Sequence, residues 1–83
     1  MRRKARRARV RNAYVEPVSM AVLRRRDDDT CRLCGLPVDF DRKQPDPDAA
    51  TIDHVVALVR GGEHSYENTQ LAHFRCNTAK GAG

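Results

Sequence analysis

The sequence has no tryptophan, and its 83 residues include only four aromatic side chains, those of Tyr14, Phe40, Tyr66 and Phe74. A domain of this size buries only about 60% of the surface that its unfolded chain exposes, so its stability is marginal. With so few large side chains, a hydrophobic core of ordinary size is not expected. Chains this short commonly depend on a disulfide, a bound metal or a partner, and the sequence therefore predicts a cross-link of this kind.

The sequence has three cysteines, Cys31, Cys34 and Cys76. An odd number does not suit a closed disulfide framework, because one thiol would be left over. No apolar run is long enough for the core of a signal peptide or for a bilayer span, so we expect no membrane partner. The simplest interpretation is a protein of the reducing cytoplasm, whose thiols are free to bind metal.

Acidic residues are absent from residues 1–11, which contain seven Lys or Arg residues. The rest of the chain contains nine Lys or Arg residues and eleven Asp or Glu residues. A basic arm of this kind suits a polyanion, because each neutralised phosphate releases counterions. The alternative is a solvated, disordered tail. A membrane-surface role is less favoured, since the bases alternate with Ala and Val and leave no strong apolar face. We predict a flexible arm over residues 1–16 and one folded domain over residues 17–83. The nucleic-acid-binding residues predicted are Lys80 and those of the arm: Arg2, Arg3, Lys4, Arg6, Arg7, Arg9 and Arg11.

Two segments in the first half of the domain have recognisable patterns. Residues 17–26 predict a short helix, with Pro17 at its first position and an apolar face formed by Val18, Ala21 and Val22. The three aspartates at 27–29 oppose the helix dipole, so the helix is expected to end there. Residues 30–48 are rich in turn formers, and the sequence Cys31-Arg32-Leu33-Cys34-Gly35 has the character of a knuckle that aims two thiols at one point.

The second half predicts a strand and a helix. Residues 50–58 are rich in β-branched side chains, and Gly61 and Gly62 then interrupt the pattern. Residues 69–80 are predicted to form a helix, with Lys80 in its last turn and Gly81 just beyond. The expected order is helix, knuckle, strand pair, loop and helix, a small α+β domain.

Cys31-x2-Cys34 and His73-x2-Cys76 form two ligand pairs separated by 38 residues. Structural zinc takes four nitrogen or sulfur ligands in a tetrahedron, often from pairs of this spacing. A residue just before a helix and one in its first turn can converge on one ion. The alternative is that Cys76 is a small buried residue and His73 a surface residue. Because the pattern uses every cysteine, we predict a zinc site that ties the knuckle to the final helix.

A second group of residues has the chemistry of phosphodiester cleavage. His54 is a candidate general base, because imidazole titrates near neutral pH. Asp53 and Asn77 offer hard oxygen ligands that suit magnesium or manganese. Neighbouring residues of a regular strand face opposite sides, so Asp53 and His54 share a site only if the strand ends, twists or bulges there or if a metal bridges them. Each residue also has a structural alternative, such as a helix cap for Asn68; His64, beside two glycines, is interpreted as a loop histidine rather than a catalyst.

The sequence resembles the HNH endonucleases of the ββα-metal superfamily in a combination of five features. These are the knuckle, the Asp-His pair, the Gly-Gly pair, the following Asn and the Cys-Asn-x-x-Lys ending. The resemblance is closest to small stand-alone members from phages and actinobacteria and covers roughly residues 20–81. It implies a zinc-stabilised ββα-metal fold, here with an N-terminal helix and a basic arm. It also implies hydrolysis of DNA with one divalent ion, leaving 5′-phosphate and 3′-hydroxyl ends.

The resemblance assigns a role to each matching residue. His54 matches the general base, Asp53 and Asn77 match ligands of the catalytic ion, and Asn68 matches the asparagine that holds the loop and orients the base. The implied structural zinc ligands are Cys31, Cys34, His73 and Cys76. Two positions depart from the common pattern: Asn77 stands where His is usual, which argues against a metal that prefers imidazole, and His73 stands where Cys is commoner.

Three functions compete. The first is a metal-dependent endonuclease that nicks or cuts double-stranded DNA, associated with a phage or mobile element, for example in DNA packaging beside a terminase. The second is a zinc-stabilised nucleic-acid-binding module without catalysis. The third is a regulatory protein whose arm docks on an acidic partner. Asp53, His54, Asn68 and Asn77 favour the enzyme, because a binding module has no need of them.

Overall fold

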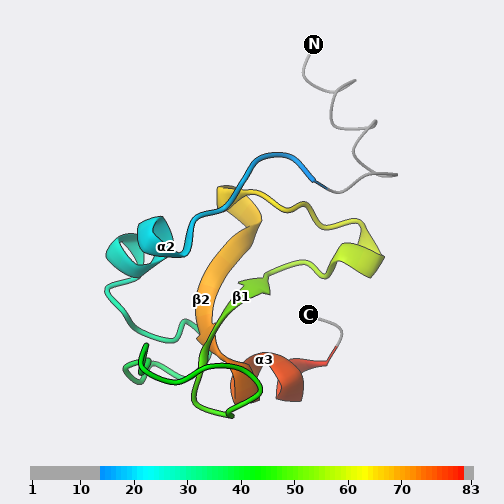
Figure 1. Ribbon diagram of the computed structural model, residues 1–83. Coiled ribbons are helices and arrows are strands. Elements are labelled where there is room, and N and C mark those ends of the chain that lie inside the picture. The colour runs from blue at the N-terminus through cyan, green and yellow to red at the C-terminus, as the bar shows by residue number, and fades with distance from the viewer. Residues whose placement is uncertain (1–13, 82–83) are drawn as a thin grey trace.

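The structure is a computed structural model that describes residues 14–81. An antiparallel pair of strands lies at its centre, with α2 beside the sheet and α3 at its lower end (Figure 1). The predicted α+β class is confirmed, since two helices and a two-stranded sheet form the described part of the chain. None of the described helices has the length and apolar character that a membrane span requires.

The first helix, α2, is shorter than predicted and buries a different side chain. It spans Met20–Arg26, because Ser19 is still extended and acts as its N-cap. The predicted apolar face is wrong in part: Ala21 is exposed, whereas Leu23 is completely buried. The helix does end at the aspartates, where Asp27 is the C-cap.

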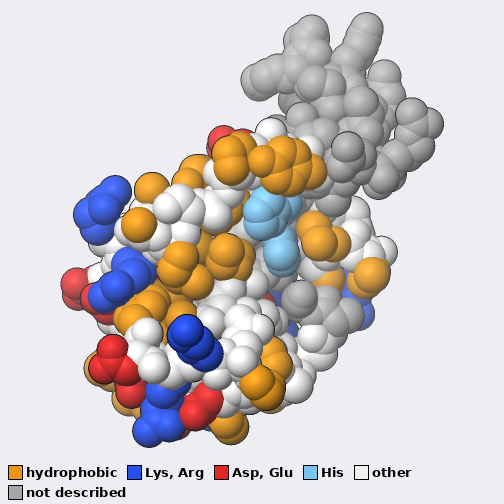
Figure 2. All heavy atoms as spheres, in the orientation of Figure 1, with side chains coloured by type: hydrophobic (Ala, Val, Ile, Leu, Met, Phe, Trp, Pro, Cys, Tyr) orange, Lys and Arg blue, Asp and Glu red, His pale blue; other side chains and the backbone are white. Residues whose placement is uncertain are grey.

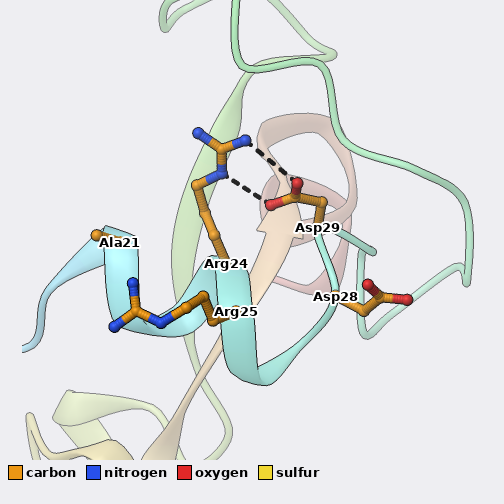
Figure 3. Close-up of a pocket in the computed structure, with 5 residues that line it drawn as sticks. All are labelled: Ala21, Arg24, Arg25, Asp28 and Asp29. Atoms are coloured by element: carbon orange, nitrogen blue, oxygen red, sulfur yellow. Dashed lines mark hydrogen bonds and ion pairs between the residues drawn. The ribbon is translucent and has the colours of Figure 1, made fainter.

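After the helix, Asp28 and Asp29 adopt positive φ angles of 56° and 51°, a conformation that aspartate tolerates better than most residues. Arg24 points back and pairs with both carboxylate oxygens of Asp29, whereas Arg25 and Asp28 point away from this pair (Figure 3). Both partners are about half exposed, at 44% and 48%. The pair therefore shapes the turn but contributes little stability.

The sheet consists of β1, Ala50–His54, and β2, Thr69–His73, with Ala50 opposite His73 and His54 opposite Thr69. The predicted strand over 50–58 is too long, because the chain leaves the sheet after His54. The predicted helix over 69–80 is also wrong in its first five residues, which form β2; α3 spans Phe74–Lys80. Four of the five residues of β2 are buried, so the polar alternation of a half-exposed strand is missing from its sequence.

The core is small and partly built from cysteine. Its buried cluster contains Cys31, Val38, Leu71 and Ala72, and Cys76 packs against it. Among the described residues, the largest completely buried side chains are two leucines, one thiol and one carboxylate: Leu23, Leu71, Cys31 and Asp53. The carboxylate is costly to bury without a partner, so it marks a place where something beyond apolar packing holds the fold, whereas a thiol packs as a small apolar side chain.

Candidate metal and nuclease site

Four side chains from three parts of the chain converge at the lower end of the sheet. The ligand atoms of Cys31, Cys34, His73 and Cys76 all lie within 4.8 Å of one another. The knuckle that carries the first pair is closed by a bridge between Thr30 and Pro37 and turns at Gly35, whose φ is +83°. His73 is the N-cap of α3 and Cys76 lies in its first turn. All three thiols are free of disulfides.

Backbone amides prepare Cys31 to bind a cation. Burial by itself raises the pKa of the Cys31 thiol, but the amides of His73 and Cys34 donate to its sulfur, each at 3.4 Å, and the net effect lowers the pKa to about 6. Burial and the nearby sulfurs of Cys34 and Cys31 raise the pKa of the Cys76 thiol to about 11. One positive ion between these sulfurs would remove that conflict, because thiolates are the form that binds metal.

The imidazole of His73 is oriented by its second ring nitrogen. Nε2 lies 2.9 Å from the carbonyl oxygen of Pro37, to which it donates. This arrangement fixes the tautomer and directs the Nδ1 lone pair at the sulfurs of Cys34 and Cys76, which lie 3.4 Å and 3.8 Å away. Metal-binding histidines are usually held by such an outer hydrogen bond.

These separations fit zinc. Bond lengths of about 2.3 Å to sulfur and 2.0–2.1 Å to nitrogen place tetrahedral S and N ligands about 3.6 Å apart. The observed distances from His73 Nδ1 lie on both sides of that value. Three sulfurs and one imidazole are also soft donors, and such a set binds zinc in preference to magnesium or manganese.

A completely buried carboxylate lies at the opposite end of β1. Asp53 has no exposed surface. Its Oδ1 and Oδ2 accept hydrogen bonds from Lys80 Nζ at 2.9 Å and 3.0 Å, and Oδ2 accepts another from Gln70 Nε2 at 2.9 Å. Lys80 Nζ also donates to the carbonyl oxygen of His54 at 2.7 Å. The last turn of α3 therefore covers the end of the strand where Asp53 and His54 lie.

His54 is in contact with a second histidine. Its Nε2 lies 3.0 Å from Nδ1 of His64. The His64 ring is also stacked with the ring of Tyr14, with centroids 5.7 Å apart. Burial lowers the pKa of His54, and the neighbouring His64 lowers it further, which keeps the ring neutral near pH 7. Among the described residues, none makes a hydrogen bond to Nδ1 of His54. The histidines that reach the surface form one group bordered by hydrophobic side chains (Figure 2).

Asn68 holds the loop that joins the two histidines. Its side-chain oxygen accepts from the amide of Val56 at 2.9 Å, and its Nδ2 donates to the carbonyl oxygens of Val56 and Glu63 at 3.0 Å and 2.8 Å. These bonds take the place of strand pairing after His54. The loop is so tight that a Cβ at Gly62 would lie 1.7 Å from the Val56 carbonyl oxygen, so only glycine fits there.

Asn77 lies on the face of α3 that meets β1. Its Nδ2 is 3.5 Å from the carbonyl oxygen of Ile52, and it precedes Lys80 by three residues on the same helix face. The preceding residue, Cys76, faces the zinc cluster instead. The short helix thus presents neighbouring residues to two different sites, and it brings Asn77 to the strand that carries Asp53 and His54.

The predicted arm residues up to Arg11 lie outside the described residues, as does the start of the predicted 1–16 segment. Of the predicted nucleic-acid contacts, Lys80 is described, and its ammonium faces Asp53. Sequence reasoning missed three partners at this site: Gln70 on Asp53, His64 on His54, and Arg60, which shares a cavity with Lys80. A histidine two residues after the Gly-Gly pair was the one available signal.

These features define a class: an α+β protein whose hairpin and short helix form a ββα unit, with a Cys₃His cluster that fits zinc. A family model described as HNH endonuclease matches residues 31–83, which is more than half of the chain. The chain belongs to the HNH endonuclease family, and this membership implies a nuclease-type activity with a metal site. Comparison with curated proteins gives no match, and neither does comparison with solved structures.

Proposed function

We propose that this protein is an endonuclease that hydrolyses phosphodiester bonds of double-stranded DNA with a divalent ion, magnesium or manganese. One observation carries the proposal: His54, a neutral imidazole to whose Nδ1 no residue of 14–81 makes a hydrogen bond, directly follows a fully buried carboxylate, Asp53, where β1 meets α3. A binding module needs no imidazole beside that carboxylate, whereas a hydrolase needs a base next to a cation site.

The donor set at this point suits a hard cation. Asp53 offers carboxylate oxygens, and Asn77, which points its Nδ2 at Ile52, retains its amide oxygen. Asp53 already holds a positive group, the Lys80 ammonium. A divalent ion held here would neutralise charge on the phosphate and on the leaving oxygen.

In this mechanism His54 accepts a proton from water at Nδ1. We assign the proton between the two rings to Nε2 of His54, which then donates to Nδ1 of His64 at 3.0 Å and leaves the lone pair on Nδ1 of His54. The resulting hydroxide attacks phosphorus, the bond from phosphorus to the 3′ oxygen breaks, and that oxygen takes up a proton. The products are a 5′-phosphate and a 3′-hydroxyl. Asn68 keeps the 55–64 loop, and with it His64, in place.

We assign the DNA contacts to basic residues around the end of the molecule where Asp53 and His54 lie. Within residues 14–81, Arg60 makes no ion pair, and it lines a cavity together with Lys80. The basic arm leads into Tyr14, which lies against His64. We assign the arm to non-specific phosphate binding. Association with a phage or mobile element, a terminase partner and a cytoplasmic location are further proposals that rest on the resemblance.

A second candidate function has one observation in its favour. Lys80 pairs with both carboxylate oxygens of Asp53 and so joins α3 to β1, a structural role that also suits a zinc-stabilised DNA-binding module that has lost catalysis. The two candidates differ in a nicking assay on supercoiled plasmid with magnesium or manganese.

The assay compares wild type with His54→Ala, with Val59→Ala as the control, since Val59 is 82% exposed on the same loop. The nuclease proposal expects nicking by wild type and the control but none by His54→Ala. Intact plasmid with all three proteins, at full zinc content, would favour the binding module.

A further inference from the structure

The ammonium group of Lys80 occupies a cation site made by this chain's own oxygens. Nζ lies 2.9 Å and 3.0 Å from the two carboxylate oxygens of Asp53 and 2.7 Å from the carbonyl oxygen of His54. Three oxygens within 3.0 Å surround one positive charge. These include the carboxylate atoms that the proposed function assigns to a divalent ion.

The burial of Asp53 explains why a cation must be present. The carboxylate has no exposed surface, and Gln70 gives it a hydrogen bond but no charge. A buried carboxylate without a positive partner is strongly destabilising. Lys80 meets this need while keeping 29% of its side chain exposed, so the same long side chain can leave without unfolding the helix that carries it.

A divalent ion and the ammonium cannot both contact the same two oxygens, because like charges at such a separation repel strongly. A place for the displaced side chain exists next to the site. A cavity of about 220 Å³ is lined by three residues that follow β1, by Arg60 and by Lys80 itself; the three are Val55, Val56 and Ala57.

We propose that Lys80 is a displaceable internal cation: it holds Asp53 when no metal is bound, competes with the divalent ion and thereby sets the metal affinity of the site. This inference rests on the proposed function, which places the ion at Asp53. Displacement moves the ammonium toward Arg60, where an anionic phosphate would retain it. Metal and DNA should therefore each favour binding of the other, since such coupling is reciprocal.

The test is a calorimetric titration of zinc-loaded, full-length protein with Mn²⁺ in the absence of DNA. Lys80→Met should bind Mn²⁺ roughly tenfold more tightly than wild type, within the usual range of coupling between two sites. Lys80→Arg, which keeps the charge, should stay close to wild type. Arg60→Met is the matched control, because it removes one charge from the same cavity without touching Asp53.

Every outcome bears on the proposal. Equal Mn²⁺ affinity in Lys80→Met and in wild type, or an equal gain in Arg60→Met, overturns the competition. Asp53→Asn distinguishes a failure of the Lys80 competition from a failure of the proposed function. If this variant binds Mn²⁺ as wild type does, the ion is not at Asp53 and the proposed function fails as well. If Asp53→Asn loses Mn²⁺ while Lys80→Met is unchanged, only the competition is wrong. Should Lys80→Met not fold, Lys80→Gln, whose amide still donates to the carboxylate, is subject to the same criteria.

Discussion

Single side chains in the 55–68 region hold the loop beside the proposed base, His54. Asn68 makes three hydrogen bonds to the backbone of the loop between the two contacting histidines, His54 and His64. The apolar side chains of the loop add little to this, since Val55, Val56, Leu58 and Val59 are all exposed. The amides of Val15 and Glu16 hold the backbone of His64 from outside the loop, and Asn68 holds the loop from within.

Asn68→Ala should lower nicking activity and destabilise the domain by about 1–3 kcal/mol, because it removes three hydrogen bonds to the backbone of the loop. Urea unfolding at full zinc occupancy measures the stability, and plasmid nicking measures the activity. Glu67→Ala is the neighbouring exposed control and should change neither. A loop role for Asn68 would be contradicted by unchanged activity in Asn68→Ala.

His64 is expected to act as a positioning residue, through His54. Replacing it with alanine should reduce kcat about tenfold or more, the scale expected when a reacting group is slightly misplaced, while KM changes little. His64→Asn, which keeps an acceptor near the position of Nδ1, should recover part of the loss. A change confined to KM would instead mean that His64 contacts DNA.

At the scale of elements, one aspartate joins the first helix to the sheet. Asp27 accepts from Arg26 and from the backbone amide of Leu71 in β2, and Arg26 donates to the carbonyl oxygens of Tyr66 and Thr69. The Arg26 guanidinium beside it lowers the pKa of Asp27, so the carboxylate is charged near neutral pH.

Asp27→Asn should therefore reduce the free energy of unfolding by about 1–3 kcal/mol, the range for hydrogen bonds to charged groups. Chemical denaturation of the zinc-loaded protein measures this change. Asp28→Asn is the matched control, because Asp28 is exposed and asparagine accepts its positive φ. Equal stability of the two variants would show that Asp27 does not join α2 to β2.

The elements also show what the sequence could and could not predict. The end of α2 and the end of α3 followed from local signals, the aspartates and Gly81. The start of α3 did not, because β2 is buried on both faces and its apolar residues do not alternate. The ligand spacing nevertheless held: His73 and Cys76 were predicted to lie just before a helix and in its first turn, and they do. The spacing of the ligands therefore located the start of the helix better than the helical pattern did, which placed it at residue 69.

The partners of Asp53 and His54 could not be predicted from the sequence for a different reason. Lys80 and Asp53 are 27 residues apart, and their pairing depends on how α3 packs against β1. No local periodicity encodes such a contact. The residue types of the cysteine and histidine cluster were predictable from their chemistry, whereas the ion pair of Lys80 with Asp53 emerged only from the tertiary structure.

At the scale of the whole molecule, zinc is expected to replace the missing hydrophobic core. Cys34→Ser should lose its zinc and unfold, because a thiolate leaves the cross-link between the knuckle and α3. Metal analysis of the purified protein and a circular-dichroism melt measure both effects. Leu33→Ser, an exposed change in the same knuckle, is the control and should retain zinc. A Cys34→Ser protein with one zinc per chain and an unaltered melting point would refute this ligand assignment.

The basic arm should act on DNA affinity and not on folding. Deleting residues 2–11 removes seven bases, and the slope of log affinity against log salt should flatten by about 0.9 for each phosphate of duplex DNA that the shortened protein leaves unneutralised. Fluorescence anisotropy over a salt series measures that slope. The same slope with and without the arm would mean that the arm is a solvated tail.

The central claim is that two ions of different chemistry act in one small domain, a structural zinc among sulfurs and a catalytic divalent ion among oxygens. Nicking of supercoiled plasmid by protein that carries one zinc per chain, measured before and after addition of Mg²⁺ or Mn²⁺, tests it most directly. The account predicts no cleavage with zinc alone and cleavage once the second ion is added. Full cleavage with zinc alone, or intact plasmid at every concentration of the second ion, would contradict it.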